Sequence, residues 1–199
     1  SVMTTYDNFD HSKALDRCVV YIDERKFDVA ASVLATQTQY FVHIFSENFK
    51  DHEKREARLV SSDIGFGPDD FHKLLSFVYP GGSINENNYI ALLKCSEFFN
   101  CLSILDQIES FIMKHCSPSA WQSHKKAQSH PFCIDLIKGI ELAFEFNFMK
   151  LKDHVRDVML TVRYHTFLKN WPDALLLTNE EKAFIFDTYS RSIIESQKA

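Results

Sequence analysis

Glycine and proline are scarce in this chain, and their scarcity excludes a class of function. Among 199 residues there are five glycines and five prolines. Loops that cradle phosphate groups need closely spaced glycines. The segment Gly65-Phe66-Gly67-Pro68 lacks a third glycine, and it also lacks the lysine followed by serine or threonine that such loops use. We therefore interpret it as a turn, and we predict no cofactor-binding residues.

Cysteine is also scarce, and the five cysteines do not indicate a framework of disulfide bonds. They are odd in number and irregular in spacing, and most lie in apolar runs, as buried free thiols do. Cys95 and Cys101 lie six residues apart, so we expect them to face different sides of a helix as core residues. This usage predicts a reducing compartment without disulfide bonds.

The densest group of metal-ligating residue types is His115, Cys116, His124, His130 and Cys133. A structural zinc site usually has close cysteine pairs, or a cysteine pair followed by a histidine pair. The spacing here matches neither arrangement. Solvated linker histidines are therefore the favoured interpretation over zinc, and we predict no metal ligands.

Long apolar runs and clusters of basic residues are absent as well. A membrane span needs about 20 apolar residues, and the start Ser1-Val2-Met3-Thr4 lacks the basic and apolar regions of a signal peptide. The net charge is −5, and the densest charged run, residues 51–56, mixes both signs. Binding of nucleic acid needs clustered lysine and arginine. We expect a soluble intracellular protein, in cytoplasm or nucleus, that binds neither nucleic acid nor membrane.

Catalytic patterns are missing, whereas phenylalanine is abundant. Neither a Gly-x-Ser-x-Gly elbow nor a flanked reactive cysteine occurs, so we predict that the chain is not an enzyme. There are 18 phenylalanines, many in clusters at helical spacing. Any single one can belong to the core. Some aromatic side chains must nevertheless reach the surface of so small a body, where they anchor interfaces. The surplus predicts a protein that binds proteins.

The first half of the chain changes its hydrophobic period several times. Residues 18–22 and 27–29 flank a charged turn and predict a β-hairpin. Two short helices are expected on either side of the polar residues 36–39, and a short strand over 57–61. Helices are predicted from Asp69, which precedes the stripe of Phe71, Leu74, Leu75 and Val78, and over 86–99 and 102–115.

The second half is helical in pattern after a polar segment. Residues 117–131 lack an apolar stripe and are predicted to be a linker. Helices are expected around 136–144 and 151–162. A third helix begins at a capping box formed by Thr178 and Glu181, with Phe186, Tyr189 and Ile193 as its buried stripe. We therefore predict an N-terminal segment (1–13), a domain (14–116), a linker (117–131) and a helical extension (132–199).

The order and spacing of these elements resemble the BTB (POZ) domain family over about residues 14–116. The specific parts are the hairpin-to-helix passage ending in Tyr40-Phe41, and the helix ending in Phe77-Val78-Tyr79-Pro80-Gly81. Agreement in order, spacing and element type is stronger than any single motif. The resemblance implies an α+β, mostly helical fold in which a short hairpin and strands cap a helical cluster. Residues 132–197 resemble the BACK-like helical extension of many BTB proteins, including nematode ones.

Two positions depart from the family pattern. Ala30 stands where the family usually has histidine, two residues after the position of Asp28. Arg17 directly precedes the first apolar run, where the family usually has aspartate. We expect apolar packing to replace a polar contact of the family fold, which weakens the case for a surface pocket built from those charges.

The resemblance also implies partners and a contact site. BTB domains commonly form homodimers through helices and swapped N-terminal segments, for which Val2, Tyr6 and Phe9 are the available apolar residues. Many BTB proteins bind a cullin scaffold through a hydrophobic residue, any residue and then glutamate, in the loop after the Tyr-Phe helix. Phe49-Lys50-Asp51 occupies that position, with Phe45 before it. The alternative is that Phe49 packs on its own loop while Asp51 is solvated.

These implications lead to two hypotheses of function. The first is a self-associating substrate adaptor of a cullin-based ubiquitin ligase, in which the protein positions another protein and performs no chemistry itself. The alternative is a BTB scaffold that assembles a regulatory complex, transcriptional or other, without binding a cullin. Binding to a cullin N-terminal domain discriminates between them.

Overall fold

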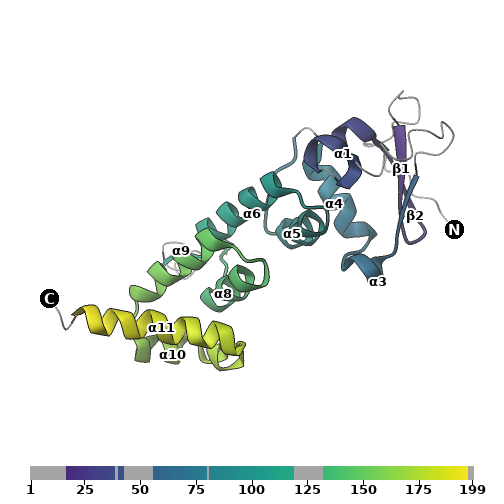
Figure 1. Cartoon of the computed structure of the whole chain (residues 1–199). Coiled ribbons are helices and arrows are strands. Elements are labelled where there is room, and N and C mark those ends of the chain that lie inside the picture. Colours follow the sequence, from purple (N-terminus) through teal and green to yellow (C-terminus); the bar gives the residue numbers. More distant parts are fainter. Residues whose placement is uncertain (1–16, 39, 43–55, 80, 119–131, 197–199) are drawn as a thin grey trace. The chain divides into compact units, whose positions relative to one another are not determined.

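The computed structural model describes residues 17–38, 40–42, 56–79, 81–118 and 132–196 (Figure 1). The chain divides into two compact units, residues 1–108 and 109–199, and the division falls within helix α6 (Leu102–His115). The predicted α+β, mostly helical class is confirmed, because a small sheet is accompanied by helices in both units. The predicted linker over 117–131 lies largely outside the described residues, and the predicted domain bounds stay a prediction.

The sheet of the first unit has three strands in the order β2-β1-β3. β1 (Arg17–Ile22) pairs antiparallel with β2 (Arg25–Ala30) and parallel with β3 (Glu56–Leu59). The predicted hairpin is confirmed, with a shorter turn of Asp23 and Glu24. Asp23 adopts a positive φ of 53°, a conformation that aspartate tolerates in turns.

Asp23 also stabilises the start of the helix that follows β3. Its Oδ1 accepts a hydrogen bond of 2.9 Å from the backbone N–H of Ser61, the first residue of α3 (Ser61–Ile64). That bond lowers the pKa of the Asp23 carboxyl below its ordinary value. The sequence pattern did not predict α3, because its cap comes from a residue 38 positions earlier.

Helices α1 (Ala31–Gln37), α4 (Pro68–Val78) and α5 (Tyr89–Phe98) complete the described core of the first unit. α4 begins with proline at its first turn, and Asp70 accepts a bond of 3.2 Å from the Gly67 N–H, as stable helix starts do. The rings of Phe27 and Phe71 pack edge to face, with centroids 5.0 Å apart. The stripe predicted for α4 is buried at Phe71, Leu74 and Leu75.

The two positions that depart from the family pattern have different environments. Asp28 is buried and forms ion pairs with Arg17 and, at 3.0 Å, with Lys26. Charge is therefore retained on this part of the hairpin. Ala30 is buried, and its backbone N–H donates a hydrogen bond of 3.1 Å to the Tyr79 hydroxyl, so the end of β2 is tied to the end of α4.

The second unit is helical in its described part. It contains α8 (Leu136–Glu145), α9 (Met149–Leu160), α10 (Tyr164–Asn170), the 3-10 helix η3 (Pro172–Leu176) and α11 (Asn179–Ser196). The predicted helices at α8, α9 and α11 are confirmed, whereas α10 and η3 were not predicted. The capping box at Thr178 is confirmed, because Glu181 accepts bonds of 2.7 Å from both the backbone N–H and the hydroxyl of Thr178.

The stripe predicted for α11 is wrong. Phe186 is 68% exposed and Ile193 is 56% exposed, and only Tyr189 of the predicted three is buried. The buried face instead contains Glu181, Ile185, Thr188 and Tyr189. Ile185 and Phe186 are neighbours in sequence, so they point about 100° apart around the helix, and the pattern alone selected the wrong one of two apolar faces.

Candidate functional site

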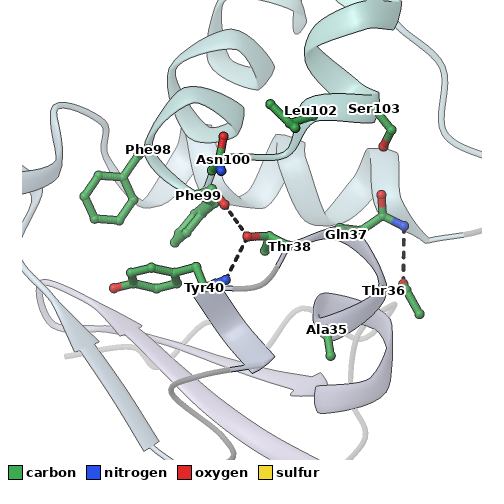
Figure 2. Close-up of a pocket in the computed structure, with 10 residues that line it drawn as sticks. All are labelled: Ala35, Thr36, Gln37, Thr38, Tyr40, Phe98, Phe99, Asn100, Leu102 and Ser103. Carbon is green, nitrogen blue, oxygen red and sulfur yellow. Dashed lines mark hydrogen bonds between the residues drawn. The ribbon is translucent and has the colours of Figure 1, made fainter.

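A groove of about 490 Å³ lies in the first unit, where the end of α1 meets the junction of α5 and α6 (Figure 2). We call it the Thr38 groove. Its volume falls in the range of sites that bind small molecules or short segments. None of its lining side chains carries a formal charge at neutral pH: Ala35, Thr36, Gln37, Thr38, Tyr40, Phe98, Phe99, Asn100, Leu102 and Ser103.

Thr38 holds the floor of this groove together. It is buried, and its extended backbone ends α1. Its hydroxyl donates to the carbonyl oxygen of Phe99 and accepts a bond of 3.1 Å from the Tyr40 N–H (Figure 2). A short polar side chain at this position caps the helical residues 40–42. The same hydroxyl fastens them to the end of α5.

An aromatic wall forms one side of the groove. The Tyr40 ring makes edge contacts with Phe98 and Phe99, with centroids 5.6 and 5.2 Å apart. Phe41 and Phe99 are fully buried behind it, 4.7 Å apart. Burial raises the pKa of the Tyr40 hydroxyl above its ordinary value.

The opposite rim is exposed and apolar. Leu102 is 67% exposed at the start of α6. Asn100 adopts a positive φ of 53° after α5, which turns the chain directly into α6. Sequence reasoning missed the Thr38 groove because its parts lie about 60 residues apart, as the bond between Thr38 and Phe99 shows. The polar residues 36–39 were the one local signal in this region, and they were interpreted as the break between two short helices.

The predicted site residues are not placed by the structure. Phe45, Phe49 and Asp51 lie outside the described residues, as do Val2, Tyr6 and Phe9. Phe45 follows Val42, the last described residue of the Tyr40 helix, by three positions in the sequence.

A second groove, of about 420 Å³, lies in the second unit between the end of α8 and the junction of η3 and α11. We call it the α8–α11 groove. It is lined by four glutamates and by apolar or hydroxyl side chains: Glu141, Phe144, Glu145, Leu176, Leu177, Thr178, Glu180 and Glu181. Of these residues the sequence pattern singled out Thr178 and Glu181, as a capping box only, and it did not predict the groove, because segments 30 or more positions apart form its two sides.

Four of the five cysteines are buried, and Cys133 is half-buried. Cys18, Cys95, Cys101 and Cys116 are buried, and none of the four forms a disulfide bond among the described residues. Burial raises the pKa of the Cys101 thiol to about 11 and that of Cys116 to about 12, and it raises the pKa of Cys95 as well. The Cys95 and Cys101 thiols each end in the core, but not on one helix as expected, because α5 ends at Phe98.

Among the residues that the structure describes, no group of three histidine, cysteine, aspartate or glutamate side chains could hold a metal ion. His124 and His130 lie outside those residues. No helix in the described ranges has the length and apolar character to cross a bilayer.

A family model decides the identity of the first unit. The model of the BTB/POZ domain matches residues 6–116, which is more than half of the chain. The chain belongs to the BTB/POZ family. This match bears out the resemblance drawn from Tyr40-Phe41 and Phe77-Val78-Tyr79. BTB domains are protein-interaction domains, so the first unit is an interaction module.

Relatives of this BTB protein combine the domain with other modules. BTB and MATH domain-containing protein 36 of Caenorhabditis elegans is 32% identical over 109 residues, covering 54% of this chain and 33% of the relative. Kelch-like protein 6 of Homo sapiens is 25% identical over 173 residues, covering 86% of this chain and 27% of the relative. The BTB protein thus spans a third or less of the length of these two relatives.

A solved structure is also similar. The BTB domain of zebrafish PATZ1 shares 19% sequence identity with this chain at a TM-score of 0.39, covering 49% of this chain and 75% of that structure.

The region that follows the BTB domain is helical. Sequence analysis predicted helices there from the resemblance to BACK-like extensions, and over residues 132–196 the structure has the helices α8 to α11.

Proposed function

We propose that this BTB protein is a self-associating substrate adaptor that binds a cullin scaffold through Phe45, Phe49 and Asp51. The observation that carries the proposal is the BTB/POZ match over 6–116, together with Phe49-Lys50-Asp51 at the position where the family resemblance implies the cullin contact. The proposal includes a location in cytoplasm or nucleus, and homodimers that involve Val2, Tyr6 and Phe9.

The Thr38 groove supports this proposal through its chemistry. Its aromatic wall and the exposed Leu102 offer an apolar surface, and Tyr40 and Asn100 offer hydrogen-bonding groups. Large aromatic side chains beside an apolar hollow are typical of the centre of a protein interface. The proposed partner-binding surface of the BTB domain therefore includes the Thr38 groove.

The test is calorimetric titration of the chain with a cullin N-terminal domain. We expect Phe49→Ala to weaken binding by about tenfold or more, because buried aromatic residues dominate interface energies. Asp51→Glu extends the carboxylate by one methylene toward the family's usual length, so we expect binding at least as tight as that of the wild type. Phe186→Ala is the matched control, since it removes an exposed phenylalanine in the second unit.

Light scattering on the same samples separates the two hypotheses of function. A chain that forms dimers yet fails to bind the cullin domain would refute the adaptor proposal and favour the scaffold alternative. The shorter carboxylate of Asp51 is the feature that favours that alternative. A monomeric mass would refute self-association.

A further inference from the structure

The α8–α11 groove carries an excess of negative charge. Glu141 is paired with Lys138, whose Nζ lies 3.1 Å from Glu141 Oε2. Glu145, Glu180 and Glu181 line the groove without an ion pair to any residue that the structure describes. Two further cations have other contacts. Lys152 lies 4.5 Å from the centroid of the Phe144 ring and donates to Asn147 Oδ1 at 3.0 Å, and Arg156 lies 5.1 Å from the centroid of the Phe184 ring and is paired with Asp153.

The stability of the helices explains only some of the glutamates in the groove. Glu180 and Glu181 lie in the first turn of α11, where the helix dipole favours acids, and Glu181 caps that helix through Thr178. Glu145, by contrast, is the last residue of α8, which has no basic residue in its last turn. The carboxyl end of a helix carries partial negative charge, so an acid there is unfavourable for the helix itself. A cation in the groove would offset that repulsion.

The same groove exposes apolar surface beside its carboxylates. Leu176 is 83% exposed and Leu175, its neighbour in η3, is 71% exposed. Phe144 lines the groove as well, and its ring packs edge to face on Phe184, with centroids 5.3 Å apart. Exposed leucines fixed beside carboxylates indicate a partner that is apolar and basic at once, since neither character alone complements this surface.

We propose that the α8–α11 groove binds a short segment of a partner protein in which arginine side chains are interleaved with leucine-like side chains. The planar guanidinium group of arginine can bond two carboxylate oxygens in parallel, which suits a groove lined by Glu145 of α8 and Glu180 of α11. The apolar side chains of the segment pack on Phe144 and Leu176. This surface lies in the second unit and does not depend on cullin binding by the BTB domain.

The test is fluorescence anisotropy of a fluorescein-labelled synthetic peptide of alternating arginine and leucine, titrated with the full chain. We expect Glu145→Gln/Glu180→Gln to weaken binding by about tenfold or more, because hydrogen bonds between charged groups are the strong ones. Leu176→Ser should weaken binding too. The matched control is Glu86→Gln/Asp157→Asn, which makes the same change in net charge at exposed sites outside the groove.

Further peptides and variants distinguish specific binding from non-specific attraction between charges. A peptide with serine in place of leucine, and another with lysine in place of arginine, should bind more weakly than the first peptide. Equal losses in the groove variant and the control variant would overturn the proposal, as would wild-type chain that does not bind. The chain itself carries two adjacent lysines, Lys125 and Lys126. If the peptide binds only after both are replaced, in Lys125→Ala/Lys126→Ala, these lysines and not a partner compete for the groove, and the proposal is overturned.

Discussion

Gly139 lies in the interior of α8, where glycine weakens a helix by about 0.5–1 kcal/mol relative to alanine. Its place is explained by packing. A Cβ atom built on Gly139 would lie 2.5 Å from the Sγ of Cys116 and 3.4 Å from a methyl group of Val155. The Cys116 thiol is buried, so it has little room to move away. A glycine in the middle of a helix thus marks a close contact that helix propensity alone does not reveal.

We therefore expect Gly139→Ala to lower the free energy of unfolding by about 1–3 kcal/mol, despite the better helix propensity of alanine. Urea unfolding followed by circular dichroism measures the change. Introducing Gly139→Ala into a Cys116→Ala background should cost much less, because the clashing sulfur is gone. An equal loss in both backgrounds would contradict the steric explanation.

Single residues were predicted best where their role is local. Thr178 and Glu181 were identified from their spacing, because a capping box is formed within four residues. Thr38 and Asp23 were not assigned their roles, because each bonds a segment far along the chain. Phe186 and Ile193 were predicted to be buried but are exposed, because α11 has two apolar faces and the sequence does not show which one packs on the rest of the chain.

Helix α9 depends on a carboxylate from another helix. Its N-cap residue, Phe148, has no side-chain acceptor for the free N–H groups of the first turn. Glu109 of α6 is buried, and its Oε1 accepts a bond of 2.9 Å from the Leu151 N–H. The positive end of the helix dipole favours this negative charge.

Removing that acceptor should loosen α9. We expect Glu109→Ala to lower the free energy of unfolding by about 1–3 kcal/mol, because it leaves a buried N–H unsatisfied. Glu109→Gln, which keeps an acceptor oxygen, should cost less. Hydrogen exchange at Leu151, read by mass spectrometry or NMR, reports the local effect, and the exposed Glu97→Ala is the control. Unchanged exchange in Glu109→Ala would exclude the capping role.

Elements with a strong periodic stripe were predicted with nearly correct bounds. α6 runs from Leu102 to His115 as expected, and the β1–β2 hairpin is a local pairing. The short α3, α10 and η3 were missed, because their few residues carry no stripe. Tertiary contacts decide whether such segments become helical.

For the whole molecule, the buried thiols predict how stability depends on pH. In the unfolded chain these cysteines titrate near their ordinary pKa of 9.0, whereas burial holds Cys101 at about 11, Cys116 at about 12 and Cys95 higher than normal. The folded chain therefore keeps these protons while the unfolded chain loses them. The stability that they contribute is complete below pH 9 and falls as the pH rises from 9 toward 12.

Urea unfolding at pH 7.5 and at pH 10 tests this dependence. We expect the free energy of unfolding to fall by about 1 kcal/mol for each of the three thiols over this interval. In Cys101→Ala/Cys116→Ala the fall should be smaller by about 2 kcal/mol. A variant that loses stability as steeply as the wild type would show that other groups cause the dependence.

At this scale the family was predictable and the binding surfaces were not. The BTB/POZ assignment depended on the order of many local patterns, and the family match over 6–116 bears it out. The Thr38 groove and the α8–α11 groove are each assembled from segments distant in sequence. No local motif specifies such a surface.

The strand order β2-β1-β3 has a consequence for biosynthesis. When the ribosome has released residues 17–30, β1 and β2 can already pair as a hairpin, because their partners are neighbours. In the described sheet the other edge of β1 pairs in parallel with Glu56–Leu59, which emerges later. A nascent chain therefore passes through a stage in which its central strand is temporarily an edge strand. Such edges invite pairing with other chains, so translation speed between residues 30 and 59 bears on how much protein reaches the native fold.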